Sequence, residues 1–291
     1  MDDNPLTIGR GSRVRRWRNA LLVILAVPLL AGGAWWTTQE PRDNRAWIPE
    51  MKAMPAAHID GNRLHISNVR NFRYQPDGTP IPGYYNRTYA LDDVRTVWFV
   101  VSPFTGKPKG LAHSFVTFGF ADSSYLAISV EARREVGERY DALAGLLRHY
   151  ELIYVIGDER DVIGKRALLS EDPLYLYPIK APHEKIRAML VSMVSRANGL
   201  RARPEFYNTL TNNCTSTIVD HVNQVSPKRV PAGLKTMLPG YADEVAMRIG
   251  LIDAKTDIEK MRPLFRINDI ARAAYGDTAF SLKIRESLGE P

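Results

Sequence analysis

The sequence predicts an α+β domain that follows one membrane-spanning helix. Three features lead to this prediction: an uncharged apolar run near the N-terminus, a group of short segments rich in aromatic and β-branched residues, and later segments whose apolar residues recur with the helical period. The strand-like segments stand in a group with helices around them, which favours an antiparallel sheet. A composition of 45% hydrophobic and 24% charged residues excludes disordered and collagen-like proteins.

Residues 20–36 (ALLVILAVPLLAGGAWW) form the apolar run, which is long enough to span a hydrocarbon core of about 30 Å. Five arginines precede it, so the positive-inside rule predicts that residues 1–19 are a cytoplasmic basic tail and that the rest of the chain is exported. We therefore expect contact with a lipid bilayer through residues 20–36. A cleavable signal peptide is the alternative, because the small residues Gly32, Gly33 and Ala34 lie where a cleavage site would be expected.

Residues 37–60 are polar and contain Pro41 and Pro49, so they are predicted to be a linker. Residues 61–291 are predicted to form the exported domain, with a soluble tail from residue 227 onward. The predicted strands are 63–66, 96–101, 113–120, 125–130, 152–156 and 174–179. The predicted helices cover 131–150, 182–199 and 214–226.

The net charge of +7 does not indicate a nucleic-acid partner. Residues 1–36 contribute five arginines against two aspartates, or +3, which leaves only +4 for the other 255 residues. No stripe of lysine and arginine interleaved with aromatic residues follows, and such stripes are typical of single-stranded nucleic-acid binders. We therefore expect no nucleic acid among the partners of this protein.

Cys214 is the only cysteine, which excludes an intramolecular disulfide, a CxxC redox pair and a zinc site built on several thiolates. It lies in the run YNTLTNNCTSTI (207–218), where Asn212 and Asn213 favour a helix N-cap. A thiol in the first helical turn is expected to have a lowered pKa and to act as a nucleophile, with helix amides available to an oxyanion. The alternative is that Cys214 is a small buried hydrophobic residue.

A thiol nucleophile needs a base, and His113 is one candidate among six histidines. His221 lies seven residues after Cys214, about 10 Å along the same helix, and is too far away. His113 opens a strand, where an imidazole could face a helix terminus, although a histidine that merely ends a strand is common. Ser129 and Glu131 could orient it from an adjacent strand, while Glu131 could instead simply open a helix.

The segments HSFVTFGF, SVEARREVGERY and YNTLTNNCTSTI together resemble the Lnb-type N-terminal periplasmic domain family, whose founding member is a bacterial lipoprotein N-acyltransferase. That family is similar to permuted NlpC/papain-like thiol enzymes, in which the cysteine heads a helix packed on a small antiparallel sheet. The resemblance implies Cys214 as nucleophile, His113 as general base, and Ser129 or Glu131 as the third residue. It further implies substrate contacts from Asn213, Arg133 and Arg134.

These observations predict a single-pass protein of the bacterial inner membrane whose periplasmic domain is a Cys/His acyl enzyme, acting on phospholipid or lipoprotein acyl groups. The span precedes the domain, unlike in the founding acyltransferase. A cell-wall peptide amidase and a non-catalytic binding module are the alternatives. No metal or cofactor is expected, because the HExxH, GxSxG, GxxxxGK and GxGxxG patterns are absent from the sequence.

Overall fold

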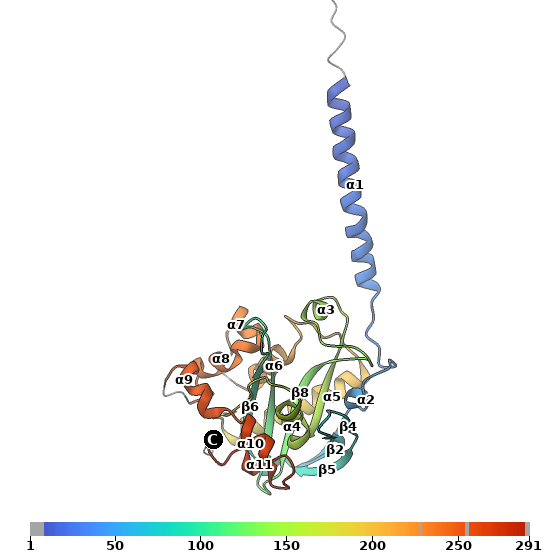
Figure 1. Cartoon of the computed structure of the whole chain (residues 1–291). Coiled ribbons are helices and arrows are strands. Elements are labelled where there is room, and N and C mark those ends of the chain that lie inside the picture. Colours follow the sequence, from blue (N-terminus) through green and yellow to red (C-terminus); the bar gives the residue numbers. More distant parts are fainter. Residues whose placement is uncertain (1–8, 227–228, 254–255, 289–291) are drawn as a thin grey trace, which may run out of the picture. The chain divides into compact units, whose positions relative to one another are not determined.

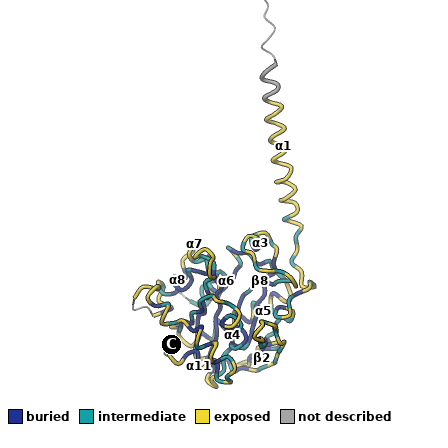
Figure 2. The backbone as a smooth tube through the Cα atoms, viewed as in Figure 1, coloured by how far each residue is buried: buried dark blue, intermediate teal, exposed yellow. Residues whose placement is uncertain are grey.

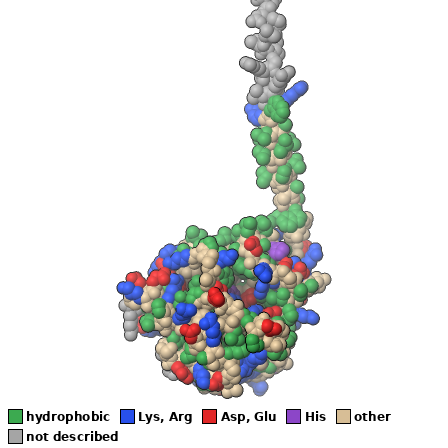
Figure 3. All heavy atoms as spheres, in the orientation of Figure 1, with side chains coloured by type: hydrophobic (Ala, Val, Ile, Leu, Met, Phe, Trp, Pro, Cys, Tyr) green, Lys and Arg blue, Asp and Glu red, His purple; other side chains and the backbone are tan. Residues whose placement is uncertain are grey.

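A computed structural model describes residues 9–226, 229–253 and 256–288, and the chain divides into two compact units, Met1–Pro41 and Arg42–Pro291. The first unit contains α1 (Gly9–Thr38). Its segment Arg15–Thr38 is long and apolar enough to cross a membrane, and its side chains are unburied (Figure 3). The predicted apolar helix is thus confirmed, and it extends beyond residues 20–36 at both ends.

The second unit is built on an eight-stranded sheet (Figure 1). Seven strands run in the order β1-β2-β9-β8-β7-β6-β10, and β5 pairs with β2 outside this path. The pairings are antiparallel except for a short parallel one between β2 and β9. The strands are β1 (Ala56–Asp60), β2 (Arg63–Arg70), β5 (Tyr84–Ala90), β6 (Val94–Pro103), β7 (Ala112–Phe120), β8 (Tyr125–Arg133), β9 (Glu151–Asp158) and β10 (Tyr175–Pro178), with β3 (Arg73–Tyr74) and β4 (Pro80–Ile81) forming a separate pair.

Helices cover both faces of the sheet, and Figure 2 shows strands of the sheet as buried. Residues that are neighbours along a strand point to opposite faces. Val116 of β7 packs into a core with α5 (His183–Ala202) and α6 (Cys214–Val225), while Phe115 packs into a second core with α4 (Glu159–Leu169). Because helices cover it on both sides, β7 is buried along its whole length, its polar residues included. The remaining helices are α2 (Pro49–Lys52), α3 (Ala142–Leu146), α7 (Leu234–Met237), α8 (Ala242–Arg248), α9 (Ile258–Met261), α10 (Asn268–Ala273) and α11 (Phe280–Lys283), with 3-10 turns η1 (Leu91–Asp93), η2 (Pro239–Tyr241) and η3 (Arg262–Phe265).

The α+β class is confirmed, and each of the six predicted strands overlaps a strand of the sheet. The helices predicted over 182–199 and 214–226 correspond to α5 and α6. The predicted helix over 131–150 is wrong. Residues up to Arg133 continue β8 through pairing with β9, Gly137 adopts a positive φ of 87°, and only Ala142–Leu146 is helical. Leu143 and Leu147, whose helical spacing predicted a shared buried face, lie at the surface and are 65% and 52% exposed.

The predicted linker 37–60 is largely part of the compact unit, which begins at Arg42. Met51 is buried in α2, and β1 forms an edge of the sheet. Pro49 was one reason to predict a linker, but proline also suits the first turn of a helix, and Pro49 opens α2 here. The prediction also missed α4, whose apolar residues do not follow a strong helical period and which packs through Val162, Ile163 and Ala167.

The segment after α6 packs against the sheet rather than forming a separate tail. Gly240 in η2 approaches the loop before β7 so closely that a Cβ atom would lie 1.9 Å from the carbonyl oxygen of Lys109. Near the C-terminus, Arg285 forms a buried ion pair with Glu159 of α4. These contacts tie both sides of β7 to the C-terminal helices, and β7 carries His113.

Candidate thiol site

Cys214 is the first residue of α6, as predicted, and is 2% exposed. Asn213 is the N-cap: its Oδ1 accepts hydrogen bonds from the backbone N–H groups of Thr215 (2.8 Å) and Ser216 (2.9 Å). Oγ of Ser216 in turn accepts a hydrogen bond of 2.9 Å from the backbone N–H of Asn213, which completes a capping box. The helix therefore starts at a fixed residue, and the thiol has a fixed position.

The expected substrate contact from Asn213 is not supported by this geometry. Asn213 is fully buried, and its Nδ2 donates to the carbonyl oxygens of Thr209 (2.7 Å) and Met237 (3.1 Å). Its Oδ1 and carbonyl oxygen accept from the N–H groups at positions 215 to 217. Those three amides are hence already bonded, which removes them as the oxyanion donors that the sequence suggested.

The first turn of α6 is attached to β7 by a pair of hydroxyl groups. Oγ of Ser114 lies 2.8 Å from Oγ1 of Thr215, and both residues are buried. Because Ser114 follows His113 and Thr215 follows Cys214, this bond brings the two candidate catalytic residues to one end of the sheet.

The resting thiol is neutral, contrary to the expected lowering of its pKa. Burial raises the pKa of Cys214 above its ordinary value. The backbone N–H and hydroxyl of Ser114 act in the opposite direction, as does the charge of Arg166, but they offset only part of the effect on this pKa.

His113, Ser129 and Glu131 lie together on adjacent strands. Phe115 of β7 pairs with Ser129 of β8, so the register places His113 opposite Glu131 on the same face. Nε2 of His113 lies 2.8 Å from Oγ of Ser129, and the Ser129 hydroxyl donates to Oε1 of Glu131 at 3.0 Å. The direct separation between Nε2 and Oε1 is 3.8 Å. The structure thus brings together the three residues that the sequence left as alternatives.

The hydrogen bonds define the tautomer of His113. A serine hydroxyl has one proton, and Ser129 gives it to Glu131, so Nε2 of His113 must carry the proton shared with Ser129. Nδ1 then holds the lone pair of a neutral imidazole.

Charges around the pocket keep Glu131 ionised and His113 neutral. Burial would raise the pKa of Glu131, but the charge that His113 carries when it is protonated in acid and the permanent charge of Arg166 hold that pKa well below its ordinary range. Burial, followed by the positive charge of Arg166, lowers the pKa of His113 to about 3. The resting site therefore contains a neutral thiol, a neutral imidazole and a carboxylate.

A pocket of about 210 Å³ joins these groups. The residues that line it include His113, Glu131, Arg134, Tyr140, Arg166, Tyr207 and Cys214. The aromatic rings of Tyr140 and Tyr207 pack edge to face and form part of its wall. Both the thiol and the imidazole therefore face the same space.

Arg133 and Arg134, which are neighbours in the sequence, lie in different surroundings in the structure. Arg134 lines the pocket, whereas Arg133 is buried elsewhere and pairs with Asp43. Nε of Arg133 also donates to the carbonyl oxygen of Met51 at 3.0 Å, so its guanidinium is used within the fold. The expected substrate contact from Arg133 is therefore not supported, because Met51 and Asp43 hold its guanidinium outside the pocket lining.

Arg166 is the site residue that sequence reasoning missed. It comes from α4, lies 3.8 Å from Oε1 of Glu131 and packs over the ring of Phe115. Its only signal in the sequence is a basic residue in an unpredicted helix. His221, excluded by spacing, is buried on α6 between Tyr154 (2.6 Å) and Ser192 (2.7 Å), away from the residues that line this pocket.

Comparison with known proteins gives one match. The family model described as the Lnb N-terminal periplasmic domain matches residues 82–240, more than half of the 291-residue chain. The matched range includes His113, Ser129, Glu131, Arg166 and Cys214. No curated protein matches the chain, and no solved structure matches it.

Proposed function

The chain belongs to the Lnb N-terminal periplasmic domain family, and we propose that its compact unit is a cysteine-dependent acyl enzyme. One observation carries the proposal: Cys214 and His113 line one pocket, while Ser129 and Glu131 hold the imidazole from the opposite side. A nucleophile, a base and a group that orients the base are the parts that covalent acyl transfer requires.

In the first step, Nδ1 of His113 takes the proton of the Cys214 thiol as the sulfur attacks an ester carbonyl carbon. The C–S bond forms, the ester C–O bond breaks, and the imidazolium returns its proton to the departing alkoxide. The products are an acyl-cysteine and an alcohol.

In the second step, an acceptor amine attacks the thioester carbon. The C–N bond forms and the C–S bond breaks, while His113 passes the amine proton to the departing sulfur. Water in place of the amine gives hydrolysis instead of transfer.

The charges of the site support this sequence of proton transfers. Glu131 is ionised and reaches His113 through Ser129, so it stabilises the imidazolium that forms in each step. Arg134 and Arg166 line the pocket and supply positive charge for the developing oxyanion in place of the bonded helix amides.

The family and α1 support a location at the bacterial inner membrane, with the N-terminus in the cytoplasm and the compact unit in the periplasm. We further propose that the domain is related to permuted NlpC/papain-like enzymes. The order of the parts favours this: the histidine strand β7 precedes α6, which the cysteine heads and which packs against the sheet.

The test uses the full chain in phospholipid nanodiscs with a lipopeptide that carries a free amine. Mass spectrometry should detect a fatty acyl group on the acceptor, and Cys214→Ala and His113→Ala should each abolish it. His183→Ala is the matched control, because His183 is exposed at the start of α5, and it should leave transfer unchanged.

Other results would replace the proposal. Cleavage of a cell-wall peptide that depends on Cys214, without acyl transfer, would assign an amidase. Absence of both reactions in a folded chain would identify a non-catalytic binding module.

A further inference from the structure

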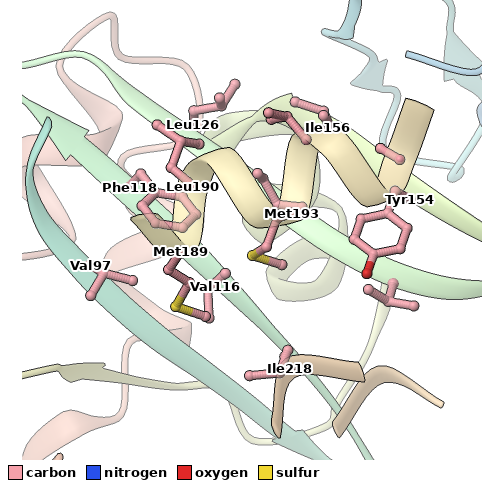
Figure 4. Packing of buried hydrophobic residues seen from close by; sticks show 14 of the residues in the cluster. Val97, Val116, Phe118, Leu126, Tyr154, Ile156, Met189, Leu190, Met193 and Ile218 are labelled. Atoms are coloured by element: carbon pink, nitrogen blue, oxygen red, sulfur yellow. The ribbon is translucent and has the colours of Figure 1, made fainter. Parts of the chain in front are cut away.

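Three large apolar side chains are exposed on one short stretch of the compact unit, residues 134–149, which we call the α3 segment. Val136 is 69% exposed, and Leu143 and Leu147 are exposed to a similar extent. Large apolar side chains of this unit pack mainly in its cores, as Leu126 does in Figure 4. A single exposed apolar residue is ordinary, but three on one short segment indicate an interaction surface.

The helix α3 has a packed side and an exposed apolar side. Leu143 and Leu147 are four residues apart, so they lie on the same side of its single turn. Gly145 faces the fold instead: it is buried, and a Cβ atom there would collide with Oγ1 of Thr209. The hydroxyl of Thr209 also donates to the carbonyl oxygen of Ala142 at 2.7 Å. The two leucines are therefore held outward by a helix that is fixed from beneath.

The α3 segment is also a wall of the thiol pocket. Arg134 and Tyr140 both belong to the segment, and both line the pocket together with Cys214. Whatever covers the exposed apolar residues therefore lies beside the pocket.

The charges around the segment suit an anionic surface. Its three carboxylates already have partners within the compact unit: Glu135 with Arg45, Glu138 with His149, and Asp141 with a backbone N–H of α3. Arg139 of the segment and Arg42 are exposed. Apolar side chains bordered by exposed arginines match the interface of an anionic phospholipid bilayer, where acyl chains lie beneath negative headgroups.

The chain enters the compact unit beside the α3 segment. The carbonyl oxygen of Ala46 accepts a hydrogen bond of 2.8 Å from the N–H of Val136. Residues 37–41 alone separate the apolar run 20–36 from Arg42, where the compact unit begins. A fully extended chain of this length spans at most about 20 Å. A bilayer that holds the apolar run is therefore within reach of the segment, whatever the arrangement of the two units.

We propose that the α3 segment docks on the surface of an anionic phospholipid bilayer and inserts Val136, Leu143 and Leu147 among the lipids. This interaction surface is separate from the apolar run 20–36, and it does not depend on acyl chemistry. For the proposed function, docking means that the thiol pocket lies at the membrane interface, beside the lipids.

The experiment measures the depth of a fluorescent label on the full chain in nanodiscs of phosphatidylcholine and phosphatidylglycerol. Cys214→Ala removes the native thiol, and Leu143→Cys or Leu147→Cys supplies one for a nitrobenzoxadiazole label. The emission of either label should shift to shorter wavelength, and lipids with a doxyl group on the acyl chain should quench it at least about twofold.

The matched control is Leu282→Cys with the same label. Leu282 is 46% exposed on α11, on the opposite side of the compact unit from α3 (Figure 1). Its label should keep the emission of an aqueous environment and should not be quenched. Equal emission and equal quenching at the three positions would overturn the proposal.

Two further outcomes decide what covers the segment. Emission at short wavelength that doxyl lipids do not quench would overturn the proposal, because protein, such as a second copy of the chain, would then cover the leucines. Discs of phosphatidylcholine alone should quench the label at position 147 about twofold less, since Arg42 and Arg139 lose their anionic partners. Unchanged quenching would contradict the assigned preference for anionic lipid.

A variant with the native thiol separates docking from chemistry. Leu143→Ser combined with Leu147→Ser should reduce acyl transfer from disc phospholipids about tenfold, because the effective concentration of lipid at the pocket falls. Acylation of Cys214 by the water-soluble ester p-nitrophenyl acetate should stay within about twofold, since neither leucine lines the pocket. Inserted labels without any acylation would refute only the proposed function, whereas transfer from phospholipids with labels that remain in water would refute only the docking.

Discussion

Nε2 of His113 lies 2.8 Å from Oγ of Ser129 on the neighbouring strand. Because that hydroxyl donates to Glu131 at 3.0 Å, the imidazole is a donor at Nε2 and a proton acceptor at Nδ1. The carboxylate thus acts on the imidazole through a serine rather than by direct contact. This relationship makes the contribution of Ser129 measurable separately from that of either ionisable residue.

Ser129→Ala should slow acylation of Cys214 by about tenfold to hundredfold, because it removes the link that orients His113 and transmits the charge of Glu131. It should also lower the free energy of unfolding by about 1–2 kcal/mol, since a buried hydrogen-bond partner is lost. The matched control is Ser192→Ala, because Ser192 lies 2.7 Å from Nδ1 of His221, outside the thiol site. If both variants slowed acylation equally, the assigned role of Ser129 would be wrong.

The alkylation rate of Cys214 should depend steeply on pH. Burial raises the pKa of the thiol from 9.0, so the thiolate is a minor species at neutral pH. With iodoacetamide, the rate should rise about tenfold per pH unit from neutrality towards the raised pKa. A plateau between about pH 5 and pH 7 would instead indicate a thiolate–imidazolium pair at rest.

Because His113 is buried in its neutral form, the domain should become less stable as the pH falls. Burial lowers the pKa of His113 from 6.5 to about 3, so between these values the unfolded chain binds more protons than the folded chain. The free energy of unfolding should therefore fall as pH decreases from 6.5 towards 3, with His113 accounting for up to about 4 kcal/mol.

His113→Gln should lose this share of the pH dependence in denaturant titrations of the full chain. His221, whose pKa burial lowers to about 4, titrates in the same window and is unchanged by the substitution. The difference between the two chains therefore reports on His113. Parallel stability curves for the two chains would show that His113 is not buried in its neutral form.

The ion pair between Arg70 and Asp161, which lies in the first turn of α4, should be essential for stability. Asp161 accepts two bonds of 2.9 Å from Arg70 and one of 2.7 Å from the N–H of Phe72, and both members of the ion pair are buried. Asp161→Ala should lower the free energy of unfolding by about 3–5 kcal/mol, because it leaves a buried guanidinium unpaired.

The control for this variant is Asp122→Ala, which removes the exposed partner of Arg87 and should cost at most about 1 kcal/mol. Chemical denaturation measures both variants. Similar small losses in the two would show that the Arg70–Asp161 pair is accessible to water.

The residues that the sequence identified best are those fixed by local rules. Asn213 is a strong N-cap residue followed by an apolar helical period, so the position of Cys214 at a helix start could be predicted. The strand that carries His113 was equally clear, because a segment rich in aromatic and β-branched residues was bounded by turn residues.

The electrostatics of the site depend on tertiary contacts that no local pattern reveals. Arg166 reaches Glu131 from a helix without a strong apolar period, and the guanidinium of Arg133 is held by Met51 and Asp43, which lie far away in the sequence. The raised pKa of Cys214 likewise depends on burial beneath neighbouring elements, which outweighs the hydrogen bonds from Ser114 and Thr215 and the charge of Arg166. The sequence therefore identified residues that meet at one pocket but predicted the wrong direction for the pKa of the thiol.

The most direct test of the account is to trap the acyl-cysteine. The full chain is mixed with an octanoyl ester, quenched in acid, and analysed by intact mass and peptide mapping before and after hydroxylamine treatment. We predict a single octanoyl group on Cys214 that hydroxylamine removes, no adduct in Cys214→Ala, and a rate at least about a hundredfold lower in His113→Ala. An adduct at another residue, equal acylation in His113→Ala, or a folded chain that never forms the thioester would contradict the account.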